Sequence, residues 1–161
     1  MGVITIWMVI SDTHDNIDKV KRAVEEAKKR NVKVVFHCGD IVAPFVIPYF
    51  SGFKLYGVFG NNDGEWLFMR EKAGDAIRKG PREEEIDGKM VAFMHEPFLL
   101  DAIVKSQMYD YVFYGHTHEL DIKKEGKTLV INPGEACGCL TGKSTVVFLN
   151  PETGEYEVLE I

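Results

Sequence analysis

Five apolar segments of this chain each run directly into a short polar turn that carries Asp, His or Asn, and this repeated feature restricts the fold more than any other. The segments are residues 3–10, 32–37, 54–59, 89–94 and 110–114. The first is rich in β-branched residues and apolar on both faces, as expected for a strand in a sheet that is covered on both sides. The pattern predicts an α/β fold whose strands end in polar turns.

The segments between and after these strands predict helices and hairpins. Apolar residues recur at helical spacing through residues 17–30, where Asp15 or Asn16 can serve as the N-cap. Shorter helices are expected within residues 65–78 and 99–106. The C-terminal strands, separated by turns that favour antiparallel hairpins, are expected at residues 119–123, 127–131, 144–149 and 156–161. Because no linker or repeat interrupts this pattern, residues 1–161 are expected to form a single domain.

Composition and charge disfavour several classes of protein. The chain has 161 residues, of which 45% are hydrophobic and 27% charged, which is ordinary for a globular domain and unlike a disordered chain. Its formal net charge of −6 disfavours binding to nucleic-acid polymers and anionic membranes. No apolar run approaches the roughly 20 residues that span a bilayer, and no basic segment opens a secretory signal. We therefore expect a cytoplasmic protein in which Cys38, Cys137 and Cys139 are free thiols.

Four of the five histidines lie in the turns that follow the expected strands. In open α/β sheets ligands bind beyond the carboxyl ends of the strands, so these turns are expected to converge on one site. Imidazole and carboxylate ligands together suit Mn, Fe, Ni, Co or Zn, and a pair of such ions needs a bridging carboxylate. The candidate ligands are Asp12, His14, Asp40, Asn61, His95, His116 and His118. The loops at residues 44–50, 65–70 and 96–100 are expected to set specificity.

Each turn taken alone has an ordinary structural explanation. Asp and His are common in turns, and a single buried histidine is more often hydrogen-bonded in a core than bound to a metal. His37, inside an expected strand, fits that ordinary role. Residues two apart point to one face of an extended chain, so Asp12 and His14 can reach one ion. For His116 and His118, the spacing leaves open whether they serve one ion or two.

The order of the five turns resembles the signature of a known family. The blocks Asp12-Thr-His14, Gly39-Asp40, Gly60-Asn61-x-Asp63, His95 and Gly115-His116-Thr-His118 resemble the calcineurin-like metallophosphoesterase pattern D-x-H, G-D, G-N-H-[DE], H and G-H-x-H. The small size and the Asn132-Pro133-Gly134 turn are similar to the compact YfcE-like phosphodiesterase group of that superfamily. The resemblance covers essentially the whole chain.

This resemblance implies a fold, a cofactor and a role for each residue. The implied fold is a four-layer α/β/β/α sandwich with mixed sheets, and the implied cofactor is two divalent ions, Mn or Ni first, with Fe, Co or Zn also suited. One ion would be held by Asp12, His14, Asp40 and His118, and the other by Asp40, Asn61, His95 and His116. A hydroxide that bridges the ions would attack phosphorus in line with the leaving oxygen. The residues implied in catalysis are Asp40, Asn61, Asn62 and His95.

Two positions depart from the family pattern. Asn62 stands where the superfamily usually has a histidine, and because an amide cannot act as a general acid, we expect a loss of roughly 10²- to 10⁴-fold on poor leaving groups. Glu135 follows Gly134, where related sequences often have serine. A carboxylate at the mouth of the site would repel a dianionic monoester more than a monoanionic diester. The expected substrate is therefore a small phosphodiester.

The expected activity is dinuclear-metal-dependent hydrolysis of a phosphoester, most directly that of a phosphodiesterase. The alternative is a binding scaffold, because a retromer subunit has the same fold with a degraded site, but the complete ligand set argues against it here. A metal-dependent nuclease would need a basic groove, which the acidic balance disfavours. Among partners we expect a small phosphodiester, no nucleic-acid polymer, no membrane, and a homodimer as the commonest oligomeric state.

Overall fold

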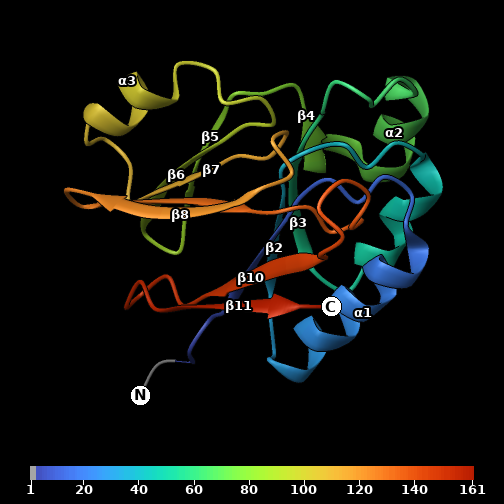
Figure 1. Cartoon of the computed structure of the whole chain (residues 1–161), viewed down its shortest axis with the longest axis horizontal. Coiled ribbons are helices and arrows are strands. Elements are labelled where there is room, and N and C mark those ends of the chain that lie inside the picture. Colours follow the sequence, from blue (N-terminus) through green and yellow to red (C-terminus); the bar gives the residue numbers. More distant parts are fainter. Residues whose placement is uncertain (1–2) are drawn as a thin grey trace.

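The computed structural model describes residues 3–161, so residues 1 and 2 of the expected domain lie outside the described part of the chain. Two mixed sheets pack face to face, and helices cover the outer side of each (Figure 1). The expected four-layer α/β/β/α sandwich is therefore confirmed.

The first sheet holds the strands that carry the first three turns of the site. Its strands are β1 (Trp7–Ile10), β2 (Val34–His37), β3 (Lys54–Val58), β4 (Ile77–Arg78), β10 (Thr145–Leu149) and β11 (Tyr156–Glu160). Their order is β11-β10-β1-β2-β3-β4, with β1 to β4 parallel and β10 antiparallel to both of its neighbours. Because β1, β2 and β3 are parallel neighbours, the turns at Asp12, Asp40 and Asn61 lie at the same edge of the sheet.

The second sheet supplies the histidine turns. Its strands are β5 (Arg82–Ile86), β6 (Lys89–Phe93), β7 (Tyr111–Phe113), β8 (Leu120–Glu125) and β9 (Thr128–Pro133). The order is β5-β6-β7-β9-β8, with β6, β7 and β9 parallel and with β5 and β8 as antiparallel edge strands. The carboxyl ends of β6 and β7 therefore lie side by side, and they lead to His95 and to the turn that holds His116 and His118.

Alternation along each strand separates the core into layers. In β1, Trp7 and Val9 point into the layer between the sheets, whereas Met8 and Ile10 point toward the helices. The inner layer is aromatic around Phe36, which is fully buried. Every strand that carries a ligand turn is thus held on both faces, so the strand ends form a rigid base for the site.

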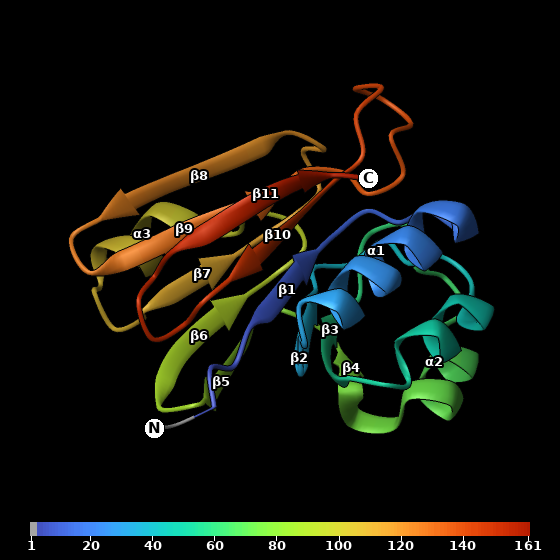
Figure 2. The same ribbon diagram turned by 90° about the horizontal axis from the view of Figure 1, so that it is seen from below.

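Helices cover the two outer faces of the sandwich. α1 (Ile17–Lys29), α2 (Trp66–Ala73) and the 3-10 helices η1 (Pro44–Phe50) and η2 (Gly74–Ala76) lie against the first sheet, and α3 (Leu100–Lys105) lies against the second (Figure 2). Asn16 caps α1, as one of the two expected alternatives, because its side chain accepts a hydrogen bond from the Lys19 amide at 3.3 Å.

Three elements differ from the sequence expectation. β1 begins at Trp7 rather than at residue 3, and Val3 and Ile4 are 82% and 65% exposed. The two-residue strand β4 and the 3-10 helix η1 were not expected, the latter in a segment interpreted as a loop. Within residues 3–161, none of the helices combines the length and the apolar character that crossing a membrane requires.

Candidate metal centre

The structure brings all seven predicted ligands together at the edge where the two sheets meet. Five of them adopt left-handed backbone conformations, with φ of 54° at Asp12, 39° at His14, 59° at Asp40, 69° at His116 and 63° at His118. Non-glycine residues rarely adopt such angles, and they persist where the surrounding structure enforces them. The turns are therefore held in a conformation that aims these side chains inward.

Asp40 lies at the centre of the cluster. Its side chain is 1% exposed, and its Oδ2 atom lies 3.3 Å from His14 Nε2 and 3.3 Å from His95 Nε2. One carboxylate oxygen thus faces imidazoles that approach from different strands. This is the arrangement that a bridging carboxylate between two ions requires.

One half of the cluster lies on the β1 side of Asp40. Asp12, His14, Asp40 and His118 each offer a ligand atom, and these atoms all lie within 4.8 Å of one another. Asp12 Oδ1 is 3.3 Å from His118 Nε2 and 3.7 Å from His14 Nε2. These four residues can surround a single cation.

The other half of the cluster, formed by Asn61, His95 and His116, lies on the β6 side of Asp40. Asn61 Oδ1 is 2.8 Å from His95 Nε2 and 3.1 Å from His116 Nδ1, and Asp40 Oδ2 completes the group. The structure thus places His116 with Asn61 and places His118 with Asp12, so the two rings lie in different halves of the cluster. The grouping agrees with the one that the family resemblance implies.

Two buried atoms test whether the cluster fits metal ions. Asp12 Oδ1 and His14 Nε2 are buried without a hydrogen-bond partner among the described residues. A buried polar atom without a partner costs about 1–3 kcal/mol, so such atoms normally mark an unfilled interaction. Both atoms face the same space, and carboxylate and imidazole are ligands for first-row divalent ions. The Asp and His side chains of the cluster therefore fit the divalent ions that the family resemblance implies.

The electrostatics of the cluster favour a cation. The neighbouring carboxylates of Asp12 and Asp40 raise the pKa of His14 to about 10. Burial acts to raise the pKa of Asp40, but the nearby imidazoles of His14 and His95 and the hydrogen bonds from Asn62 outweigh it and hold that pKa well below its usual value. The site therefore concentrates negative charge that a proton on His14 partly compensates. A bound divalent ion would displace that proton.

Residues behind the ligands orient the imidazoles. His95 Nδ1 lies 2.7 Å from the Cys38 carbonyl oxygen and donates to it, which leaves the Nε2 lone pair free to face Asp40. His118 Nδ1 lies 2.5 Å from Glu135 Oε2, which leaves Nε2 to face Asp12. In both cases the partner selects the tautomer that a metal ligand needs.

The expectation that Glu135 lines the mouth of the site is wrong. Glu135 is 1% exposed and accepts hydrogen bonds from His118, from the Thr141 amide at 2.6 Å and from the Leu140 amide at 3.0 Å. Burial acts to raise the pKa of Glu135, but the bonds from His118 and Thr141 lower it to about 2. Its charge is therefore compensated beneath the site and does not face a substrate.

Asn62 and Asp63 position Asp40. Asn62 donates to Asp40 twice, from its backbone amide and from its side chain, both at 2.9 Å. Buried Asp63 accepts from the amides of Asp40 at 3.0 Å, Gly60 at 2.7 Å and Val42 at 2.6 Å. The sequence marked Asp63 by its place in the third turn and Glu135 by its departure from the family pattern, but it did not reveal that Glu135 contacts His118.

His37 and the three cysteines have the ordinary roles expected of them. His37 is fully buried, accepts from the Gly39 amide at 3.1 Å and contacts Thr13 Oγ1 at 3.1 Å. Burial lowers its pKa to about 3, so it stays neutral. All three cysteines are free thiols.

Replacing Glu135 with glutamine is expected to weaken metal binding by about 10- to 100-fold, because an amide holds the His118 ring less firmly than a carboxylate does. Competition with a chromogenic chelator measures the affinity. The matched control is Glu119→Gln, an exposed neighbour in the chain whose side chain, among residues 3–161, makes no hydrogen bond or ion pair with His118. Equal affinities for the Glu135→Gln variant and the wild type would contradict the positioning role.

The fold and the candidate ligands together define a class of protein: an α/β/β/α sandwich with a cluster of Asp, His and Asn side chains around the Asp40 carboxylate at the strand ends. The chain belongs to the calcineurin-like phosphoesterase superfamily, because the sequence profile of the calcineurin-like phosphoesterase superfamily domain matches residues 6–154. The family resemblance in the sequence is thereby confirmed.

Three known proteins show how far the similarity extends. A phosphodiesterase of Methanocaldococcus jannaschii is 38% identical over 156 residues, which cover 92% of this chain and 94% of that protein. The structure of an archaeal phosphodiesterase aligns with a TM-score of 0.91 and 37% identity, covering 98% of this chain and 100% of that one. A Vps29 of Entamoeba histolytica in complex with zinc aligns with a TM-score of 0.62 at 15% identity, covering 98% of each chain, which shows a shared fold only.

Proposed function

We propose that this protein is a metal-dependent phosphodiesterase that hydrolyses a small phosphodiester with the aid of two divalent ions. The observation that carries the proposal is Asp40 Oδ2, which faces His14 and His95 at 3.3 Å each and so joins two ligand groups into one centre. The similarity of the whole chain to phosphodiesterases supports the choice of reaction.

The roles of the side chains follow from their contacts. Asp12, His14 and His118 would hold one ion, Asn61, His95 and His116 the other, and Asp40 both. When bound, such ions lower the pKa of water and neutralise charge on the phosphoryl oxygens. Asn62 keeps Asp40 in place, while Glu135 and the Cys38 carbonyl fix the rings of His118 and His95.

The same contacts bear on the choice of substrate. The Asn62 amide is engaged by Asp40 and carries no proton that it can transfer, so diesters with good leaving groups are the preferred substrates. The net charge of −6 disfavours a polymeric nucleic acid and repels a dianionic monoester more than a monoanionic diester. We propose Mn or Ni as the native metal, because both accept mixed imidazole and carboxylate ligands.

The experiment compares an activated aryl phosphodiester with the matching monoester. Metal-stripped protein is expected to be inactive, and added Mn²⁺ or Ni²⁺ is expected to restore hydrolysis, faster on the diester. The rate of nitrophenol release at each metal concentration measures this. Absence of turnover with each of Mn, Ni, Fe, Co and Zn would overturn the proposal and favour a binding role for the fold.

A further inference from the structure

A cavity of about 320 Å³ opens directly beside one half of the metal centre. Asn61 and His95, both proposed metal ligands, form one wall, and the aromatic side chains of Phe59, Trp66 and Phe98 also line it. Its size lies within the range of small-molecule sites. A group in this cavity would therefore be adjacent to Asn61 and His95, and so to the proposed metal centre.

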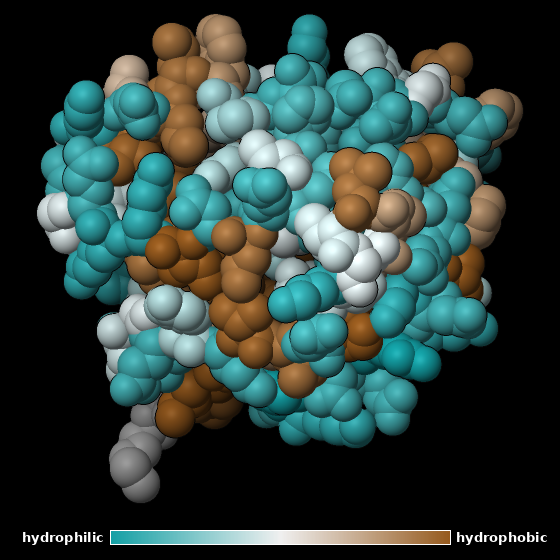
Figure 3. All heavy atoms as spheres, in the orientation of Figure 1, coloured by the Kyte–Doolittle hydropathy of each residue, from teal (hydrophilic) through white to brown (hydrophobic). Residues whose placement is uncertain are grey.

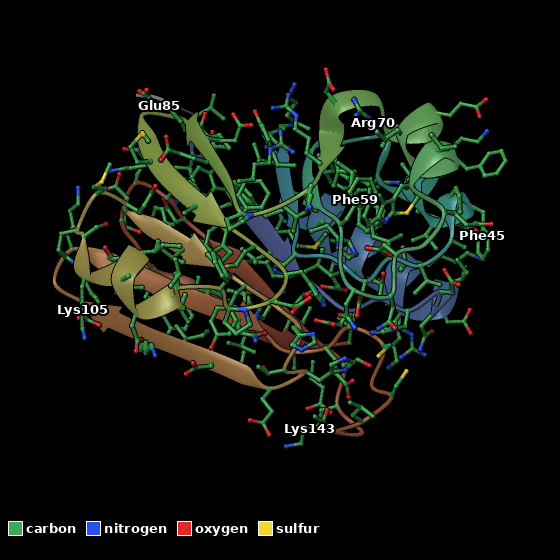
Figure 4. All side chains as sticks on the ribbon, turned by 90° about the horizontal axis from the view of Figure 1, so that it is seen from above. Phe45, Phe59, Arg70, Glu85, Lys105 and Lys143 are labelled. Carbon is green, nitrogen blue, oxygen red and sulfur yellow. The ribbon has the colours of Figure 1, made fainter. Side chains whose placement is uncertain are left out.

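The three aromatic side chains that line the cavity, Phe59, Trp66 and Phe98, are called the aromatic platform below. The rings of Phe59 and Trp66 stack with centroids 5.5 Å apart and planes at 28°, and the Trp66 indole N–H donates to the Asp63 carbonyl oxygen. This bond ties the indole to the same turn that positions Asp40. Figure 4 shows Phe59 lying inward of α2, whereas Phe45 lies at the outer edge of the molecule.

The platform is exposed although it is apolar. Trp66 is 49% exposed and Phe98 is 61% exposed. Figure 3 shows apolar side chains over α2 and near α3 on a surface that is largely hydrophilic. Exposed aromatic residues that share a cavity are typical of ligand sites, because a flat partner can bury them.

The cavity also contains polar side chains that can form hydrogen bonds with the edge of a flat aromatic ligand. The Lys79 side chain lines it and, among residues 3–161, makes no ion pair, while exposed Glu96 adds one acceptor. A flat group stacked on Trp66 would have a donor and an acceptor within the same cavity. A short aliphatic ester arm, such as a methyl group, would leave most of the surface of these aromatic rings exposed.

We propose that this cavity, lined by Phe59, Trp66 and Phe98, binds a flat aromatic group on one ester arm of the phosphodiester, with a nucleobase as the fitting chemical class. The inference rests on the proposed function and deepens it by naming the substrate class. Stacking of a base on an aromatic side chain explains why the platform is exposed and why it lies next to Asn61 and His95.

The test uses two diesters that release the same product, thymidine 5′-(p-nitrophenyl phosphate) and methyl p-nitrophenyl phosphate. The variants Trp66→Ala and Phe98→Ala are expected to lower kcat/KM about 5- to 100-fold more on the nucleoside diester than on the methyl diester. The control is Leu67→Ala, an 85% exposed neighbour of Trp66 that does not line the cavity. Equal losses on both substrates would show that the nitrophenyl ring, which both substrates carry, occupies the cavity, and no loss on either would show that the cavity holds neither arm; each result would overturn the assignment of a nucleobase.

A binding measurement separates this inference from the proposed function. Of the two tryptophans, Trp7 is fully buried, so Trp66 is the exposed reporter. Thymidine 5′-monophosphate is expected to quench its fluorescence in the metal-loaded wild type, and methyl phosphate is not. If the wild type hydrolyses neither diester, the proposed phosphodiesterase function fails; quenching by the nucleotide alone then still supports the cavity assignment, and its absence overturns it.

Discussion

Exchanging Asp40 for asparagine is expected to reduce metal-dependent diester hydrolysis by about 10³-fold or more. The carboxylate oxygen Oδ2 lies 3.3 Å from both His14 and His95, so its charge serves both halves of the cluster. An amide is neutral, and its NH₂ group repels a cation. Charge stabilisation by such ions is worth several kcal/mol, and each ~1.4 kcal/mol corresponds to tenfold in rate.

Two measurements separate this loss from unfolding. The metal content of the purified Asp40→Asn variant is expected to fall below that of the wild type, while circular dichroism stays native-like. The control Asp18→Asn changes an exposed carboxylate in the first turn of α1 and is expected to keep the activity and metal content of the wild type. A rate for Asp40→Asn within tenfold of the wild-type rate would contradict the shared role of Asp40.

The strand ends and the convergence of the candidate ligands were predictable because their signals are local. A buried strand followed by a polar turn is visible in the residues themselves, and parallel neighbours bring the turns to one edge. Asp12 and Asp40 could therefore be placed at one site before their contacts were known. The beginning of β1 was not predictable in this way, because Val3 and Ile4 are apolar but pair with no strand among residues 3–161.

The roles of Glu135 and of the histidine pair depend on backbone conformations that composition does not reveal. His116 and His118 both have positive φ, so the rule that residues two apart share a face does not apply to them. Gly134, with φ of 75°, starts a loop that returns through Thr141 and turns Glu135 beneath His118. The position of Glu135 directly after the Asn132-Pro133-Gly134 turn does not reveal this return, so the expectation placed its carboxylate at the mouth.

Truncating Phe36 to alanine is expected to lower the free energy of unfolding by about 3–5 kcal/mol. Phe36 is fully buried between the two sheets, on the strand that leads to Asp40. Its ring centroid lies 5.0–5.6 Å from those of Trp7, Tyr56, Phe93 and Phe113. Removal of the ring loses its burial and leaves a cavity that strands fixed on both faces cannot close.

Urea unfolding monitored by circular dichroism measures this effect, which is a large fraction of a typical stability of roughly 5–15 kcal/mol. The matched control is Phe45→Ala, because Phe45 is 57% exposed and its loss is expected to change stability by no more than about 0.5 kcal/mol. Similar midpoints for the two variants would show that the aromatic layer does not hold the sheets together. If Phe36→Ala also weakens metal binding, the rigidity of β2 extends to Asp40 and thus links the core to the metal centre.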